Sequence, residues 1–196
     1  MTATGDIAAL RRFAGGRAAE GQRCELCGIE IGERHEHVVE PGGGRVRCAC
    51  IACGGRFSGA DGRILRVVTG ARRVDIALDD AEWRGLGLPV AVAFFRRTGA
   101  GGVSAHFPGP AGTTAAPLDA GAWTALSARH PELPDIEPDV EALLVSRLDG
   151  AAGAYLVSID LCYRLAGILR ARWRGIAGGE EAHAAIASFL AELEGA

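Results

Sequence analysis

The sequence predicts an α+β protein, with an N-terminal zinc-ribbon-like module followed by an antiparallel sheet with helices packed on it. Three observations predict this. Two Cys-x-x-Cys pairs bracket a glycine-rich turn early in the chain. Later apolar runs come in pairs joined by short turns, which is typical of antiparallel hairpins. Helical patterns follow these pairs without strict strand–helix alternation, which favours an antiparallel sheet over a parallel one.

The amino-acid composition is that of a globular protein and argues against several functional classes. The chain has 196 residues, of which 48% are apolar and 23% charged, as in a globular protein. The net charge of −3 argues against a general binder of nucleic acid or anionic membranes. All 21 basic residues are arginines, which excludes Schiff-base and P-loop lysine chemistry. With no signal-peptide pattern and no apolar run of membrane-spanning length, we expect a cytoplasmic protein with reduced cysteines.

The chain divides into three expected parts. Residues 1–20 are expected to contain a short helix over 6–13, which ends at paired glycines. Residues 21–57 form the metal module, because five of the six cysteines lie there. Residues 58–196 form the α+β domain.

The cysteine spacing predicts the metal site. Each Cys-x-x-Cys turn brings two sulfurs together as adjacent corners of a tetrahedron around zinc. The glycine after each pair, Gly28 or Gly54, can take a positive φ and turn amides toward the sulfurs. Zn²⁺ is the expected ion, iron in a rubredoxin-like site is the alternative, and disulfides are disfavoured. The four expected ligands are Cys24, Cys27, Cys50 and Cys53.

A hairpin is expected between the two pairs, with its turn over 41–44. This register places His37 opposite Cys48 and His35 opposite Cys50, with all four side chains on one face. One ion on the four cysteines is favoured, with His35 as the substitute ligand. The alternative is a second ion or a reactive site on His37 and Cys48. The complete set of candidate ligands is Cys24, Cys27, Cys50, Cys53, His35, His37 and Cys48.

Strands and helices are expected in sequence after the metal module. The expected order is strands over 64–68 and 74–78, a helix over 79–87, strands over 89–95 and 103–107, and a loop over 108–117. Asp79 or Asp80 should cap the helix, because a short acidic side chain accepts from the amides of the first turn. The apolar strand over 89–95 and its partner over 103–107 should form a central hairpin of the sheet.

The C-terminal half is expected to continue with a helix over 118–129, strands over 140–146 and 154–158, and helices over 161–173 and 180–193. Asp160 should cap the first of the two last helices. Cys162, on the apolar side of that helix, is interpreted as a buried structural thiol. All helices are expected on one face of the sheet. Capping and surface roles are expected for the acidic residues Glu137, Asp139, Glu141 and Asp160.

Several stretches of the sequence together form a recognisable pattern. They are Arg23-Cys-Glu-Leu-Cys-Gly28, residues 35–38, 48–53 and 89–95, and residues 137–144, 155–160, 162–165 and 173–175. This pattern resembles an uncharacterised, mainly actinobacterial family of small cytoplasmic proteins classed as a domain of unknown function, whose members are often encoded beside nickel–iron hydrogenase genes. The resemblance covers about residues 10–193, and departs from the family where Ser158 replaces an expected proline.

These observations lead to one leading hypothesis. The protein is expected to be a non-catalytic, metal-binding accessory protein, because no catalytic motif stands outside the metal module. The resemblance implies a protein partner among hydrogenase subunits or maturation factors. The alternatives are a rubredoxin-like iron redox protein and a metal-trafficking protein that uses His35, His37 and Cys48 as a labile second site. Nucleic-acid binding is disfavoured by the net charge.

Overall fold

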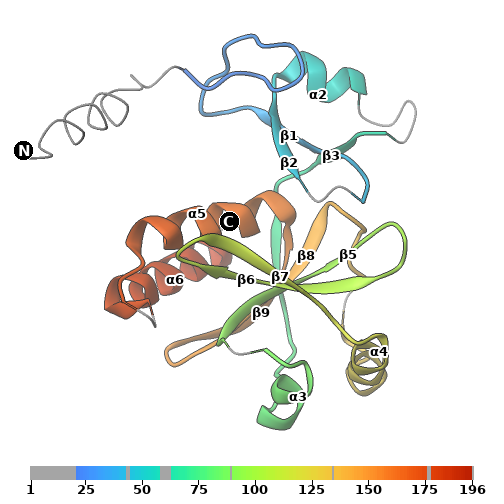
Figure 1. The fold of residues 1–196 in the computed structure, drawn as a ribbon, viewed down its shortest axis with the longest axis vertical. Coiled ribbons are helices and arrows are strands. Elements are labelled where there is room, and N and C mark those ends of the chain that lie inside the picture. The colour runs from blue at the N-terminus through green and yellow to red at the C-terminus, as the bar shows by residue number, and fades with distance from the viewer. Residues whose placement is uncertain are drawn as a thin grey trace, which may run out of the picture.

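The computed structural model describes residues 21–42, 45–57, 63–88, 90–133, 135–175 and 178–195. The helix expected over 6–13 lies outside these residues. Figure 1 shows two sheets in separate parts of the molecule. The α+β class with antiparallel sheets is therefore confirmed, because every strand pair in both sheets is antiparallel.

The first part, which we call the small module, begins with the Cys24 turn. Its sheet has the order β2-β1-β3, built from β1 (Glu36–Val39), β2 (Val46–Ala49) and β3 (Leu65–Val67). The helix α2 (Ile51–Phe57) follows β2 directly. The third strand comes after the turn-rich segment that was expected to join the two parts, and it returns to pair with β1.

The second part, which we call the body, has a six-stranded sheet in the order β4-β9-β8-β5-β6-β7. Its strands are β4 (Ala71–Val74), β5 (Val92–Arg97), β6 (Val103–Gly109), β7 (Gly112–Pro117), β8 (Glu141–Leu148) and β9 (Ala151–Ser158). Its helices are α3 (Asp80–Gly85), α4 (Ala120–Arg129), α5 (Ile159–Arg172) and α6 (Gly179–Glu194). The hairpins β5–β6 and β8–β9 agree with those expected from the sequence.

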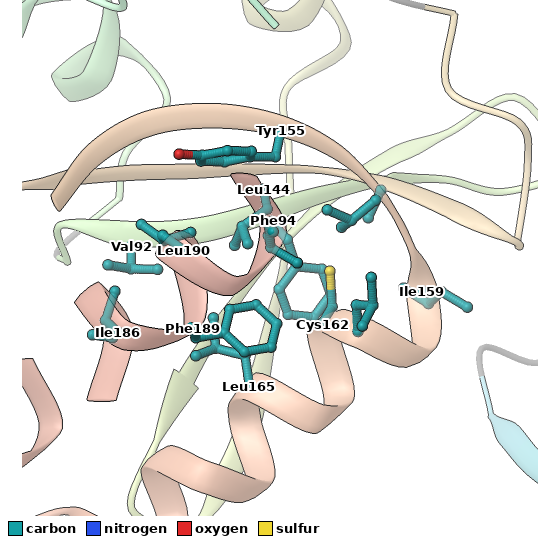
Figure 2. Packing of buried hydrophobic residues seen from close by; sticks show 14 of the residues in the cluster. Val92, Phe94, Leu144, Tyr155, Ile159, Cys162, Leu165, Ile186, Phe189 and Leu190 are labelled. Carbon is teal, nitrogen blue, oxygen red and sulfur yellow. The ribbon is translucent and has the colours of Figure 1, made fainter. Parts of the chain in front are cut away.

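Helices cover both faces of the body's sheet, so the expectation of a single covered face was wrong. On one face, Phe94 and Leu144 pack against Leu165 of α5 and Phe189 of α6, as Figure 2 shows. On the other face, Phe95 contacts the rings of Trp83 in α3 and Trp123 in α4, with ring centroids 6.2 and 5.5 Å apart. The reason is that β5 is buried at successive residues, which requires cover on both sides.

Two further local expectations were corrected. The segment 108–117 was expected to be a loop, but Gly112–Pro117 forms the edge strand β7 beside β6. Asp160 was expected to cap α5, but the helix begins at Ile159 and Ser158 occupies the N-cap position. Asp79 caps α3 as expected, in a capping box with Glu82. Cys162 is buried in the core of the body, as expected, and Figure 2 shows it near Phe94.

The small module is packed onto the body. Val39 and Val67 of its sheet belong to the same buried cluster as Leu165 and Phe189. Asp139 adds a polar joint, since its carboxylate accepts from the Gly42 amide of the β1–β2 turn at 3.1 Å and from Arg96 at 2.8 Å. Asp139 has no exposed surface and a φ of 67°. A surface or capping role was therefore the wrong expectation for this residue.

Candidate metal centre

The four cysteines of the two Cys-x-x-Cys pairs converge in the small module. Their sulfurs all lie within 4.8 Å of one another, and the sulfurs of Cys27 and Cys50 are 3.8 Å apart. Two sulfurs at adjacent corners of a zinc tetrahedron are about 3.8 Å apart when each Zn–S bond is about 2.3 Å. None of the six cysteines is in a disulfide. The structure therefore agrees with a site that could hold a metal ion.

The first cysteine pair lies in a tight turn. The Gly28 amide donates to the carbonyl of Cys24 at 2.8 Å, and Gly28 has the expected positive φ of 79°. The Cys24 amide in turn donates to the carbonyl of Ile29, which closes the loop. A residue with a side chain would be strained at this φ. Glycine therefore helps to place the first two sulfurs.

The second cysteine pair is built differently from the first. Cys53 lies in α2, which starts directly after Cys50, and Gly54 is a helical residue rather than a residue of positive φ. The expectation for Gly54 was therefore wrong. Its lack of a side chain has another reason, because a Cβ atom at Gly54 would lie 2.7 Å from the Cβ of Glu36. Glycine lets α2 approach β1 closely and so brings the second pair of sulfurs to the first.

The sulfurs of this group differ in their tendency to ionise. Burial would raise the pKa of Cys24, but backbone amides of Cys50, Leu26 and Cys27 donate to its sulfur and lower that pKa to about 6. Burial and the neighbouring thiols act together to raise the pKa of Cys53 to about 12. Four thiolates cannot share this space without a positive charge between them. A divalent ion supplies that charge, and the chemistry of four sulfur ligands suits zinc and iron.

A second group of candidate ligands lies on the neighbouring hairpin. His37 and Cys48 are directly opposite each other in the β1–β2 ladder, as expected. One ligand atom from each of His35, His37 and Cys48 lies within 4.8 Å of the others. Cys50, which was expected on the same face, joins the four-cysteine group instead. His35 is likewise grouped with His37 and Cys48 rather than with the four sulfurs.

Asp160 contacts this second group from the body. Its Oδ2 atom is 3.0 Å from Nδ1 of His37 and accepts a hydrogen bond from the Thr69 hydroxyl at 2.8 Å. Burial would raise the pKa of Asp160, but hydrogen bonds from His37, Ser158 and Thr69 outweigh it and lower that pKa to about 2. Asp160 is therefore an ionised carboxylate across the pH range in which proteins are stable. The sequence showed an acidic residue at a helix start, and no sequence signal linked it to His37.

A cleft of about 960 Å³ opens between the small module and the body. It is lined from the small module by Gln22, His37 and Cys48, among others. Residues of β5 to β7 and of α5 line the opposite side, including Arg96, His106, Asp160 and Tyr163. His106 is buried and stacks on Phe94 with ring centroids 5.0 Å apart. The cleft therefore connects the second ligand group with polar residues of the body.

Comparison with known proteins identifies one family. The family described as "Family of unknown function (DUF5947)" matches residues 23–196. Neither the curated proteins nor the solved structures contain a significant match. In the described part of the chain, no helix combines the length and the apolar character that crossing a membrane requires.

Proposed function

Because the chain belongs to DUF5947, a family of unknown function, we propose a function from the metal centre itself. The protein is a non-catalytic, metal-binding accessory protein in which a zinc ion on Cys24, Cys27, Cys50 and Cys53 holds a protein-interaction module in shape. The observation that carries this proposal is the convergence of the four sulfurs. Four protein ligands complete a tetrahedral shell and leave no position for a substrate, which is typical of structural zinc sites.

The surface of the two cysteine turns supports an interaction role. Ile29 follows the first pair and is 58% exposed, while Ile51 lies inside the second pair and is 74% exposed. Large apolar side chains at such positions lose contact with water when a partner binds, and burial of each contributes about 1.5–3 kcal/mol. The metal thus orders a loop and a helix start that each present an isoleucine. This arrangement suits recognition of an apolar patch on another protein.

The partner class follows from the family resemblance described for the sequence. Members of that family are often encoded beside nickel–iron hydrogenase genes, so we assign the partner to hydrogenase subunits or maturation factors. The proposed place of action is the assembly of the hydrogenase in the cytoplasm. This assignment rests on the resemblance, whereas the interaction surface rests on the exposed isoleucines.

Co-purification tests the proposal. The full chain is expressed with nickel–iron hydrogenase subunits and maturation factors, and the captured proteins are identified by mass spectrometry. Ile51→Glu should abolish capture without changing the metal content, because Ile51 is not a ligand. Val68→Glu is the matched control, since Val68 is also 74% exposed but lies beyond β3. Failure to capture any hydrogenase-related protein, or equal loss with both variants, would contradict the proposal.

The same four sulfurs would also hold iron, which defines the second candidate function of rubredoxin-like electron transfer. Visible absorption of the protein as purified separates the two, because a zinc centre is colourless and an iron–thiolate centre is not. A colourless protein with stoichiometric zinc is expected. A red protein that can be bleached by reduction would favour the redox function.

A further inference from the structure

We propose that His35, His37 and Cys48 form a second metal site, with one coordination position open to the cleft between the small module and the body. The site takes a divalent transition ion such as Zn²⁺, Co²⁺ or Ni²⁺. It does not depend on the partner role proposed above. The structure already orients the three ligands and places two of them at the cleft.

His35 has the tautomer that a metal ligand needs. Its Nδ1 atom lies 2.9 Å from the carbonyl oxygen of Gly32. A carbonyl can only accept, so Nδ1 carries the proton and Nε2 carries a lone pair. Nε2 is buried and has no hydrogen-bond partner among the residues that the structure describes. A buried polar atom without a partner destabilises the fold, and an ion at Nε2 would supply the missing partner.

His37 is oriented by Asp160. The Asp160 carboxylate accepts from Nδ1 of His37 at 3.0 Å, which leaves Nε2 as the ligand atom. Metal-bound histidines commonly donate their other ring N–H to a carboxylate, which fixes the ring and makes the ligand more basic. The rings of His35 and His37 meet edge to face, with centroids 4.8 Å apart. Because Nδ1 of each ring is already hydrogen-bonded, we assign Nε2 of both histidines as the ligand atoms that converge with the Cys48 sulfur.

Cys48 supplies the third ligand. It lies opposite His37 on β2, and the side-chain amide of Gln22 donates to its sulfur at 3.0 Å. Burial and the charge of Glu25 raise the pKa of Cys48 and outweigh this donor, so a bound ion would displace the thiol proton. The three ligand atoms lie within 4.8 Å of one another. Adjacent ligand atoms of a tetrahedral shell with bonds of about 2.0–2.3 Å are about 3.3–3.8 Å apart, so the group is close to the spacing that such a shell requires. Two nitrogens and one sulfur suit zinc, cobalt or nickel better than magnesium or calcium.

The fourth position is assigned to the cleft. His37 and Cys48 line the cleft, whereas His35 is not among its lining residues. Three protein ligands with an open position are typical of sites where the ion exchanges ligands, in contrast to the closed four-cysteine shell. Arg96 also lines the cleft, and its buried Nε has no partner among the described residues. Because Arg96 lends the cleft a hydrogen-bond donor, a small anion is a suitable probe for the fourth position.

Cobalt titration of the full chain tests the second site. The wild type should bind two Co²⁺ ions per chain at saturation, and both His35→Ala and Cys48→Ala should bind one. His183→Ala is the matched control, because His183 is exposed on α6, and it should still bind two. One ion in the wild type, or two ions in both site variants, would overturn the proposal. The retained ion on the four cysteines shows that each variant is folded.

Two further readouts test the geometry. Asp160→Asn should weaken binding of the second ion by about 10–100-fold and leave the first unchanged, because it removes the charge of the carboxylate that accepts from His37 and keeps the size of the side chain. Sodium azide should change the absorption difference between cobalt-loaded wild type and cobalt-loaded Cys48→Ala, since this difference isolates the second ion. An unchanged difference spectrum would overturn the open position. Equal affinity in Asp160→Asn would overturn the orienting role of the carboxylate.

Discussion

The interior of the small module differs from the interior of the body in both size and chemistry. Among the described residues, the cluster that is confined to the small module has four buried members, and two of them, Cys24 and Cys53, are candidate metal ligands. The body instead buries large aliphatic and aromatic side chains on both faces of its sheet, including Phe94, Leu165 and Phe189. Apolar burial can therefore stabilise the body without metal, whereas we expect the small module to depend on a bound ion and on its contact with the body.

Removal of the metal should produce the largest difference in stability between the small module and the body. Cys24→Ser, or a chelator, should lower the opening free energy of residues 21–57 by several kcal/mol, because metal binding contributes about 10 kcal/mol or more in isolated zinc-finger peptides. Amide hydrogen exchange measures the opening free energy of each region separately. Amides of the small module should exchange rapidly, while those of β8 and β9 stay protected.

The converse change is made in the body. Leu165 is 1% exposed, so Leu165→Ala should lower global stability by about 2–5 kcal/mol and leave the metal content of the chain unchanged. If chelation instead deprotects the body and the small module equally, the two regions fold as one metal-dependent unit and the comparison fails.

A change at Asp139, which joins the small module to the body, should have the next largest effect on the free energy of unfolding. Asp139→Asn should lower the free energy of unfolding by about 3–5 kcal/mol, because it leaves the buried guanidinium of Arg96 without its negative partner. Asparagine tolerates the positive φ at this position, so the change isolates the charge. Urea denaturation measures the loss.

Asp135→Asn is the matched control for this joint. Asp135 also pairs with an arginine of β5, Arg97, but its side chain is fully exposed. Loss of such a surface pair costs at most about 1 kcal/mol. An equally small effect of Asp139→Asn would show that Asp139 does not join the two regions.

The pH dependence of stability gives the smallest effect. Burial, together with the charge of Arg96, lowers the pKa of His106 to about 4. As pH falls, the imidazole of His106 takes up a proton in the unfolded chain before it does so in the folded protein. Its contribution to the free energy of unfolding is therefore complete above about pH 6.5 and is lost as pH falls toward 4. Between pH 7 and pH 5, the free energy of unfolding should fall by up to about 2 kcal/mol because of His106.

His106→Phe keeps an aromatic ring against Phe94 and removes the titrating group. The difference in unfolding free energy between pH 7 and pH 5 should therefore shrink in this variant. Any dependence of the unfolding free energy on pH that remains in this variant then comes from other titrating groups, including the candidate metal ligands of the small module. An unchanged pH dependence would show that His106 is not the neutral, buried histidine described here.

The features that were correctly predicted from the sequence are set by local patterns. The cysteine spacing, and the glycine-rich turn that fixes the β1–β2 register, are both contained within short segments. This is why the pairing of His37 with Cys48 could be derived from residue order alone. The cap expected at Asp79 or Asp80 is another local pattern, and the structure places it at Asp79.

The features that were missed depend on contacts between distant segments. Asp160 meets His37 across 123 positions of the chain, and Asp139 meets the Gly42 amide across 97. No local pattern distinguishes these carboxylates from surface acids. The edge strand β7 was missed because its residues, Gly112–Pro117, are small and mostly not buried, so the usual apolar signal is absent. Cover on both faces of the sheet could have been inferred from the unbroken apolar run in β5.

X-ray absorption at the metal edge of the purified Cys48→Ala variant tests the central claim most directly. This variant removes a ligand of the proposed second site and retains the four cysteines of the first. The account predicts one ion per chain, surrounded by four sulfur atoms at about 2.3 Å. A chain without a stoichiometric ion, or an ion whose shell contains nitrogen or oxygen in place of sulfur, would contradict it.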